Sequence, residues 1–392
     1  MKILITTDWY KASINGVVTS VLNLEEGLRS RGHDVKILTL SKDLHHKSEG
    51  NAYYIPSINM NKIYPNARAS IYLHNDYIDE IIKWKPDVIH SQCEFTTFIY
   101  AKKIGKMLNI PIVHTYHTIY GDYTHYLSPS KTLGRKAVST FSRKILNNVQ
   151  AVIAPTDKVS KLLKGYGVVT GIHTIPTGID LRWFNNRIPM KEKENMKQDL
   201  GIPIDNVVLL SVGRLAKEKN LDEIIKYISM MNKENISMLI VGDGPYKNKL
   251  KKDIEDYGLN NKIIFTGMVS PNEVPLYYQL GDIFISASNS ETQGLTYFEA
   301  LASGLPSICK VDPCIKDVVI DGYNGFQFDS FESFNSDINY ILDDKERYNR
   351  LCENARTTAE KYSTDVFVVK VESLYEDSIY KFGKYDNRMA VL

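Results

Sequence analysis

The sequence predicts an α/β protein made of two doubly wound domains, each with a parallel sheet covered by helices on both faces. Its 392 residues exceed the roughly 150 residues of a typical domain. Short β-branched runs alternate with longer helical periods in two sets, and a charged stretch separates the sets. Because strands separated by helices form parallel βαβ units with right-handed crossovers, this alternation indicates two parallel sheets.

The first set of predicted strands covers residues 3–7, 35–40, 88–91, 112–117 and 151–154. A helix is expected over 17–31, and Gly32 follows it where a C-cap glycine belongs. The second set covers residues 207–212, 238–241, 263–266, 283–287 and 307–310. From residue 331 onward we expect only helices.

A domain boundary is expected near residues 183–201, which contain Pro189 and the charge run 191–194. The sequence therefore predicts a first domain over 1–185 and a second over 186–364. Residues 365–392 are expected to form a C-terminal helix that packs back on the first domain.

The composition is typical of a globular protein, with 43% hydrophobic and 24% charged residues and a net charge of +2. These values exclude a disordered or histone-like chain. Residues 1–180 carry 22 Lys and Arg against 14 Asp and Glu, whereas the remainder is acidic. We expect the basic part to face an anionic partner such as a membrane surface or nucleic acid.

Localisation is expected to be cytoplasmic. The four cysteines form no C-x-x-C pair, which is typical of buried thiols in a reducing compartment. No signal-peptide-like segment opens the sequence, and no apolar run approaches the 18 residues of a membrane span.

Two loops after predicted strands carry residues suited to phosphate. Asn15-Gly16 opens a helix, where backbone N–H groups and the helix N-terminus favour an anion, although a simple glycine turn would look the same. Arg214 and Lys219 follow the strand at 207–212 and could clamp a diphosphate, or lie on a solvated loop.

The most specific signal is SETQGLTYFEALASGLPSI, residues 290–308, with Glu291 and Glu299 eight residues apart and Gly294 opening a helix between them. Free N–H groups at that helix start suit a phosphate, and carboxylates suit sugar hydroxyls because they accept several hydrogen bonds. A helix start that merely carries acids is the alternative.

Metal and nicotinamide sites are not predicted. His114, His117 and His125 crowd the end of one strand, but their spacing suits a metal poorly, and no D-x-D sequence occurs. A hydrogen bond from one histidine to substrate, or a core role for His114, fits better. The glycine fingerprint G-x-G-x-x-G is absent, which argues against a dehydrogenase.

A basic amphipathic stretch stands out between residues 122 and 157, which contain no acid between them. Its cations are Lys131, Arg135, Lys136, Arg143 and Lys144. Apolar residues interleave with them at helical spacing: Leu133, Ala137, Phe141, Ile145 and Leu146. Such a helix can lie on anionic lipid, or it can turn its apolar face inward and leave its cations in water. No nucleic-acid-binding module is recognisable, so nucleic acid is not expected as a partner.

Together these residues resemble the retaining glycosyltransferases of family 4, the group 1 glycosyl transferases with the GT-B fold. The resemblance spans essentially the whole chain. Its carriers are NGVVTSV at 15–21, HTYHT at 114–118, VGRLAKEKN at 212–220, VGDGP at 241–245, FTGMV at 265–269 and SETQGLTYFEALASGLP at 290–306. It implies two facing Rossmann-like domains, the first for the acceptor and the second for the nucleotide sugar, with the active site in the cleft between them.

Site roles follow from this resemblance, residue by residue. Gly16 matches the loop glycine facing the donor diphosphate, and Arg214 and Lys219 match the pair that neutralises the phosphates. Glu299 matches the ribose-binding carboxylate, and Glu291 the one that reaches the donor sugar. The protein backbone at Gly294, Leu295 and Thr296 matches the segment that holds phosphate and sugar. His117 matches the histidine beside the transferred sugar, and Met268 and Val269 match the loop against the base.

The implied reaction moves a hexose from a nucleotide sugar, UDP-glucose or UDP-galactose, without a metal or other cofactor. The motifs look most like bacterial diacylglycerol glycosyltransferases at the cytoplasmic membrane face, which agrees with the basic first half. Alternatives are a soluble or cell-envelope polysaccharide acceptor, or a non-catalytic partner subunit.

Overall fold

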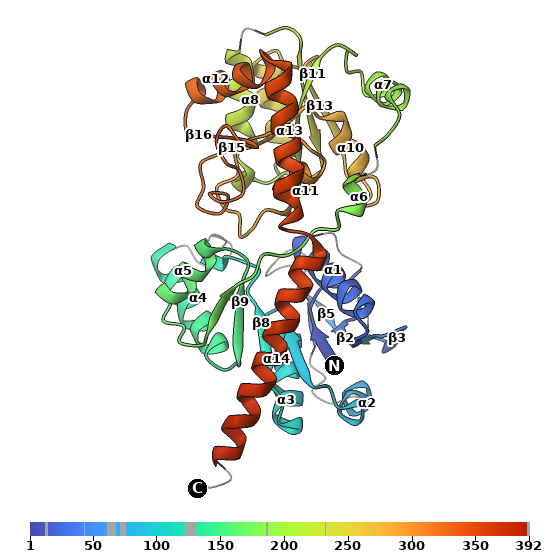
Figure 1. The fold of residues 1–392 in the computed structure, drawn as a ribbon, viewed down its shortest axis with the longest axis vertical. Coiled ribbons are helices and arrows are strands. Elements are labelled where there is room, and N and C mark those ends of the chain that lie inside the picture. Colours follow the sequence, from blue (N-terminus) through green and yellow to red (C-terminus); the bar gives the residue numbers. More distant parts are fainter. Residues whose placement is uncertain are drawn as a thin grey trace. The chain divides into compact units, whose positions relative to one another are not determined.

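The structure is a computed structural model of the chain. It describes residues 1–11, 15–42, 44–60, 68–70, 76–121, 131–185, 187–231 and 233–389, apart from the side chains of residues 131 and 385–389. The chain divides into unit 1, Met1–Gly178 with Thr364–Leu392, and unit 2, Ile179–Ser363. Each unit has its own largely parallel sheet between helices, so the predicted two-domain α/β architecture is confirmed (Figure 1).

The sheet of unit 1 has the strand order β10-β9-β8-β7-β1-β2-β4-β3, and only β3 runs antiparallel to its neighbour. Its strands are β1 (Lys2–Thr6), β2 (Asp34–Leu40), β3 (Lys47–Glu49), β4 (Ala52–Ile55), β7 (Val88–Ser91), β8 (Ile112–Thr115), β9 (Ala151–Ala154) and β10 (Ile172–Thr174). A separate two-stranded ribbon joins β5 (Ile58–Asn59) and β6 (Arg68–Ala69).

Helices cover both faces of this sheet. They are α1 (Gly16–Ser30), α2 (Asp76–Trp84), α3 (Thr96–Leu108), α4 (Lys131–Leu146), α5 (Asp157–Gly165) and α14 (Thr364–Met389). On one face, α1 and α14 share a core with the strands; on the other, α2 and α3 form a second core. The long C-terminal helix therefore belongs to unit 1, although unit 2 precedes it in the chain (Figure 1).

The six-stranded sheet of unit 2 is entirely parallel, in the order β13-β12-β11-β14-β15-β16. Its strands are β11 (Val207–Val212), β12 (Ile236–Val241), β13 (Ile263–Gly267), β14 (Ile283–Ser286), β15 (Ser307–Lys310) and β16 (Gly325–Phe328). β12 is buried along its whole length, as expected for a strand covered on both faces.

Two helical layers enclose this second sheet, with α8, α9 and α12 on one face and α10 and α11, with part of α13, on the other. The helices are α6 (Arg182–Asn185), α7 (Met190–Asp199), α8 (Leu221–Met230), α9 (Lys247–Asp256), α10 (Val274–Leu280), α11 (Leu295–Ala302), α12 (Phe331–Leu342) and α13 (Lys345–Glu360). A short 3₁₀ helix covers Lys217–Lys219.

Both sheets reverse their strand order beside their first strand. In unit 1, β2 lies on one side of β1 and β7 on the other, and in unit 2, β12 and β14 flank β11 in the same way. Ligands of doubly wound sheets bind at the carboxyl ends of the strands where the order reverses. The topology thus selects the loops after β1 and β7, and those after β11 and β14, as the places for a functional site.

Two predicted boundaries differ from the structure. The division between units lies at Gly178–Ile179, before the stretch predicted as a linker. That stretch forms α6 and α7. Lys191 and Glu192 of its charge run are exposed, Lys193 lies 3.7 Å from Asp282, and Met196 packs on the unit 2 core. The strand predicted to reach His117 ends at Thr115, although the Tyr116 N–H still bonds to the Ile153 carbonyl.

Glycines hold the loops after β11 and β12 in direct backbone contact. The Leu215 N–H donates to Asp243 O at 3.0 Å, and the Tyr246 N–H donates to Leu215 O at 3.0 Å. Gly242 has φ +134, and a Cβ there would lie 2.1 Å from the carbonyl oxygen of Gly213. The sequence VGDGP therefore fixes the position of the loop that carries Arg214.

Gly242→Ala is expected to destabilise unit 2 by about 3 kcal/mol or more, since backbone strain and a clash with a carbonyl add together. Gly258→Ala is the matched control, because φ is +67 there and nothing lies within 4 Å of the added Cβ. This control should cost only about 1–2 kcal/mol. Chemical denaturation measures both losses, and equal losses would contradict the close packing.

Candidate active site

The loops at the strand-order reversal of unit 2 are joined by an ion pair. Lys219, at the end of the 3₁₀ helix after β11, pairs with Glu291, which follows β14. Arg214 lies in the same loop as Lys219 and pairs with Glu218. The structure thus brings Lys219 and Glu291 together and leaves the Arg214 side chain about half exposed.

The N-terminus of α11 lies directly after Glu291. Gly294 precedes the helix in the left-handed region at φ +73, where an added Cβ would come within 2.4 Å of the Tyr297 ring. Gly294 is the N-cap residue and has no side chain to cap the helix, and the first turn begins with the backbone N–H groups of Leu295 and Thr296. Such a helix start favours a phosphate group.

Glu299 lies one turn further along α11, and its Oε2 accepts a 2.8 Å hydrogen bond from the Tyr278 hydroxyl. Burial raises the pKa of Glu299, and the Tyr278 bond opposes that rise. Met268 and Val269 follow β13; Met268 is exposed, whereas Val269 packs on the unit 2 core. The structure therefore places all predicted residues of this unit at the carboxyl edge of one sheet.

Gly16 is the first residue of α1 in unit 1. The Asn15 side chain caps this helix by accepting a 3.0 Å hydrogen bond from the Val18 N–H. Asn15 at this position therefore has a structural reason, because asparagine is among the preferred N-cap residues.

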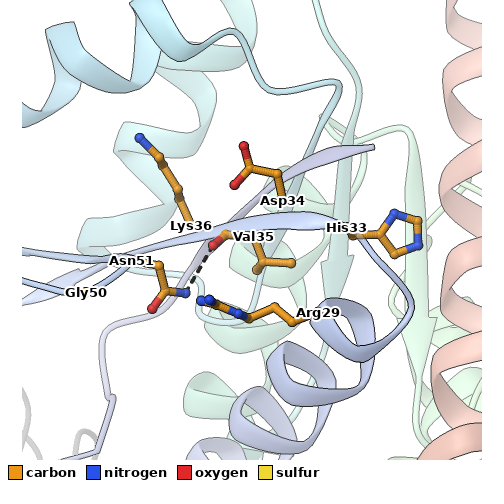
Figure 2. A pocket seen from close by; sticks show the side chains of 7 residues that line it. All are labelled: Arg29, His33, Asp34, Val35, Lys36, Gly50 and Asn51. Carbon is orange, nitrogen blue, oxygen red and sulfur yellow. Dashed lines mark hydrogen bonds between the residues drawn. The ribbon is translucent and has the colours of Figure 1, made fainter.

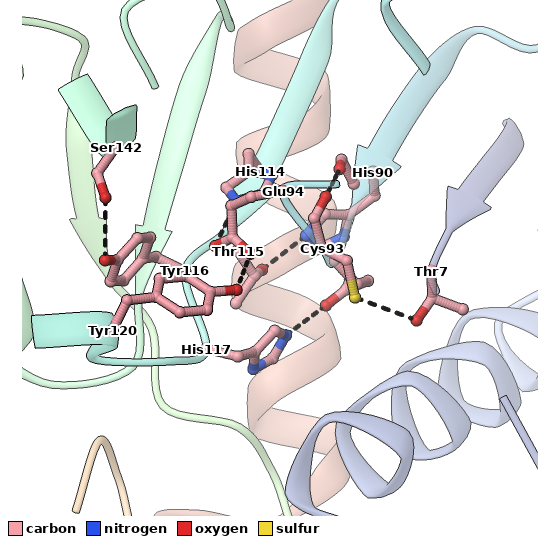
Figure 3. Close-up of polar contacts among 12 residues, drawn as sticks. Thr7, His90, Cys93, Glu94, His114, Thr115, Tyr116, His117, Tyr120 and Ser142 are labelled. Carbon is pink, nitrogen blue, oxygen red and sulfur yellow. Dashed lines mark hydrogen bonds and ion pairs between the residues drawn. The ribbon is translucent and has the colours of Figure 1, made fainter. Parts of the chain in front are cut away.

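His117 lies just beyond β8, and its Nε2 is 2.6 Å from Oε1 of Gln92 (Figure 3). Burial, with His114 as a further cause, lowers the pKa of His117 to about 3. The ring is therefore neutral near pH 7 and donates its Nε2 proton to the amide oxygen. Its Nδ1 keeps a lone pair with which it can accept a hydrogen bond from a substrate hydroxyl.

A buried polar network surrounds His117 at the carboxyl edge of the unit 1 sheet. Glu94, after β7, accepts a hydrogen bond from the Tyr120 hydroxyl and lies 3.3 Å from His114 Nε2. On the other face of the sheet, His90 contacts Thr115 (Figure 3). Its other ring nitrogen contacts the hydroxyl of Tyr375 in α14. His114 is thus a buried partner of Glu94, and His125 lies outside the described residues.

Sequence reasoning missed Asp8, Gln92 and Glu94. Each is at least 95% buried. Asp8 lies two residues after β1, Gln92 directly after β7 and Glu94 two residues beyond Gln92. A signal was available, because these residues stand immediately after two predicted strands.

The hollow shown in Figure 2 does not belong to this site. It measures about 530 Å³ and lies at the amino end of β2. Its lining residues are Arg29, His33, Asp34, Val35, Lys36, Gly50 and Asn51. None of the predicted site residues is among them.

In the part of the chain that the structure describes, no three His, Cys, Asp or Glu side chains are grouped so that they could hold a metal. Likewise, no described helix is both long and apolar enough to span a membrane.

Solved structures share this fold. Alr3699/HepE of Anabaena in complex with UDP has a TM-score of 0.76 at 16% identity, covering 96% of this chain and all of that one. Sucrose-phosphate synthase of Thermosynechococcus elongatus has a TM-score of 0.74 at 19% identity, covering 96% and 98%. The two parallel-sheet units are therefore those of a GT-B glycosyltransferase, as the motifs predicted.

Family models match both units: glycosyltransferase family 4 over residues 14–183 and glycosyl transferases group 1 over 192–358. The chain belongs to the group 1 glycosyl transferases of family 4. It is 35% identical to the alpha-monoglucosyldiacylglycerol synthase of Acholeplasma laidlawii, covering 99% of this chain and all of that protein. With the synthase of the same name from Streptococcus pneumoniae it shares 36% identity, over 82% and 74% of the two chains.

Asp8→Asn is expected to stabilise the protein at pH 7. Burial raises the pKa of Asp8 from 3.8 to about 6. Between these values the folded chain holds a proton that the unfolded chain releases, so stability falls as pH rises from about 4 to about 6. This difference in pKa corresponds to a loss of roughly 3 kcal/mol in the free energy of unfolding at pH 7, and the uncharged asparagine avoids that loss.

Urea denaturation of both proteins at pH 7 and pH 4.5 measures this effect. The advantage of Asp8→Asn should shrink strongly at the lower pH. An equal effect at both pH values would show that the carboxyl titrates normally.

Proposed function

We propose that this glycosyltransferase moves glucose from UDP-glucose to diacylglycerol with retention of the anomeric configuration, at the cytoplasmic face of a membrane. The observation that carries the proposal is the full-length similarity to the alpha-monoglucosyldiacylglycerol synthase of A. laidlawii. The fold is also that of HepE, whose structures hold UDP and UDP-glucose. The paired cations of unit 2 and the N-terminus of α11 suit such a donor.

In this proposal, unit 2 stabilises the diphosphate leaving group. Arg214 and Lys219 supply positive charge, and the first N–H groups of α11 supply aligned donors. Lys219 is already oriented by Glu291, which in turn faces the sugar hydroxyls, while Glu299 binds the ribose. These cations take the place of a metal ion, so the reaction needs none.

The bond between the sugar C1 and the diphosphate oxygen breaks, and the acceptor oxygen bonds to C1 on the same face. A leaving phosphate oxygen takes the acceptor proton, so no protein carboxylate is required as a nucleophile. Neutral His117 accepts a hydrogen bond from the transferred sugar at Nδ1, because Gln92 already holds its Nε2 proton.

The exposed face of α4 supports membrane binding. Leu133 is 68% exposed, Phe141 is 41% exposed and Ala137 is also exposed, whereas Ile145 and Leu146 pack on a core of unit 1. The first part of the apolar stripe is therefore open to a lipid surface. Phe141 stacks on the exposed Phe95 of the neighbouring loop, with ring centroids 5.9 Å apart. The exposed cations of the same helix are Arg135, Lys136, Arg143 and Lys144, whereas the Lys131 side chain lies outside the described set.

The transfer itself is tested with UDP-glucose and dioleoylglycerol in mixed micelles that contain EDTA. An α-glucosyl lipid is expected, and NMR of the product reads its anomeric configuration. UDP-galactose and GDP-mannose serve as competing donors. A β product, a strict requirement for added magnesium, or transfer only to a water-soluble acceptor would each contradict the corresponding part of the proposal.

Arg214→Ala is expected to lower kcat about 100-fold, the usual cost of removing one charge-stabilising group from a developing anion. The control is Lys217→Ala, which removes an exposed cation from the same loop and should keep kcat within about twofold. Steady-state kinetics with UDP-glucose measures both. Wild-type turnover in Arg214→Ala would place the diphosphate elsewhere.

Cosedimentation with phosphatidylglycerol vesicles tests the α4 surface. Binding is expected to these but not to phosphatidylcholine vesicles, and 1 M salt should weaken it because the Debye length falls to about 3 Å. Changing Arg135, Lys136, Arg143 and Lys144 to Gln should abolish it, removing roughly 4 kcal/mol at about 1 kcal/mol per cation.

Changing Lys247, Lys249, Lys251 and Lys252 of α9 to Gln removes the same charge from unit 2 and is the matched control. It should leave vesicle binding intact. Equal loss in both quadruple variants would indicate a non-specific charge effect, and a wild type that ignores anionic vesicles at low salt would remove the membrane surface from the proposal.

A further inference from the structure

The strand-order reversal of unit 1 holds buried polar groups that the donor site does not use. The Gln92 N–H donates to Thr6 O at 2.8 Å, so the loop after β7 is bound directly to the end of β1. Asp8 and Gln92 therefore lie at the one point of this sheet where its topology favours a ligand.

Asp8 is a buried carboxylate that can accept a further hydrogen bond. It is 5% exposed, and its Oδ1 accepts a 2.9 Å hydrogen bond from the Thr97 N–H at the start of α3. The Thr97 hydroxyl and the Thr96 backbone act on Asp8 as further hydrogen-bond donors. A carboxylate has about four acceptor positions, so about one remains for a ligand. Capping α3 accounts for one oxygen and not for the burial of the whole group, which raises the pKa of Asp8 to about 6.

Gln92 supplies the complementary donor. Its side chain is 2% exposed, and its amide oxygen is held by His117 at 2.6 Å. Among the described residues, Nε2 of Gln92 has no hydrogen-bond partner. A buried donor of this kind is unfavourable unless a ligand pairs with it, because buried polar groups are almost always hydrogen-bonded.

We propose that Asp8 and Gln92 together bind the reacting hydroxyl group of the acceptor alcohol. A hydroxyl carries one donor and two acceptor positions, so before transfer it can donate to the Asp8 carboxylate and accept from Gln92 Nε2. As its oxygen bonds to C1, the proton leaves the Asp8 hydrogen bond and passes to the leaving phosphate oxygen. Gln92 then links the acceptor to His117, which the family resemblance places beside the transferred sugar. The inference rests on the proposed function, which it extends from the donor to the acceptor.

Charge at this position selects the acceptor class. Glu94 acts electrostatically on Asp8 and shares its edge of the sheet. Both Glu94 oxygens are already in contact, one with Tyr120 and the other with His114, so Glu94 contributes negative charge without competing for the hydroxyl. Two carboxylates disfavour a phosphate-bearing acceptor and favour an uncharged alcohol such as the glycerol hydroxyl of diacylglycerol.

The isosteric variants Asp8→Asn and Gln92→Glu test this assignment with dioctanoylglycerol as the acceptor. Each removes one hydrogen-bonding function, and kcat/KM for the acceptor should fall about 10- to 100-fold, the usual range for a bond that involves a charged group. The dissociation constant of UDP, measured by calorimetry, should stay within twofold in Asp8→Asn. Asp157→Asn is the matched control, since this exposed carboxylate follows β9 on the same sheet edge.

The outcomes are distinct. An acceptor kcat/KM within twofold of wild type in Asp8→Asn would overturn the inference and leave Asp8 as a cap of α3. An equal loss in Asp157→Asn, or loss of UDP binding in Asp8→Asn, would overturn it as well. A wild type that transfers glucose to another alcohol but not to dioctanoylglycerol would refute the proposed acceptor, and the same variants assayed with that alcohol would then decide the inference.

Discussion

A parallel sheet can bind a ligand only where its crossover helices leave room, and that requirement governs both units of this chain. The helices connecting successive strands lie on opposite faces on either side of β1 and of β11, so the loops diverge at those points. Lys219 and Glu291 meet across one divergence, and Asp8 and Gln92 lie at the other. Glycine contacts such as Gly242 against Gly213 hold the supporting backbone in place.

The polar groups at these two positions differ in their partners and in how deeply they are buried. In unit 2 the cations Arg214 and Lys219 are paired with carboxylates and remain partly accessible, as the proposed exchange for a phosphate requires. In unit 1 the groups are almost completely buried, and burial holds the pKa of His117 low and that of Asp8 high. The first arrangement suits a charged leaving group, and the second suits a neutral hydroxyl.

Much of the fold follows from local sequence, because strands such as 151–154 and 207–212 are short, largely apolar and rich in β-branched residues, and they lie where the sequence predicts them. The motif around Gly294 likewise identified a helix start that the structure contains. The unit boundary could not be located in the same way, because a run such as 191–194 looks alike on a linker and on the solvent face of α7. The position of Gln92 after a predicted strand could have been noticed, but the lack of a partner for its Nε2 among the described residues is evident only from three-dimensional packing.

The return of α14 to unit 1 gives the protein an unusual order of assembly. The core beneath α1 includes Phe367, Val368, Val371 and Tyr375 from that helix, yet the ribosome makes them only after all of unit 2. Unit 2 is continuous in the chain and can fold while synthesis continues, whereas the earlier-made strands of unit 1 must wait with an apolar face uncovered. Nascent unit 1 is therefore the segment with the greatest need of a chaperone during translation.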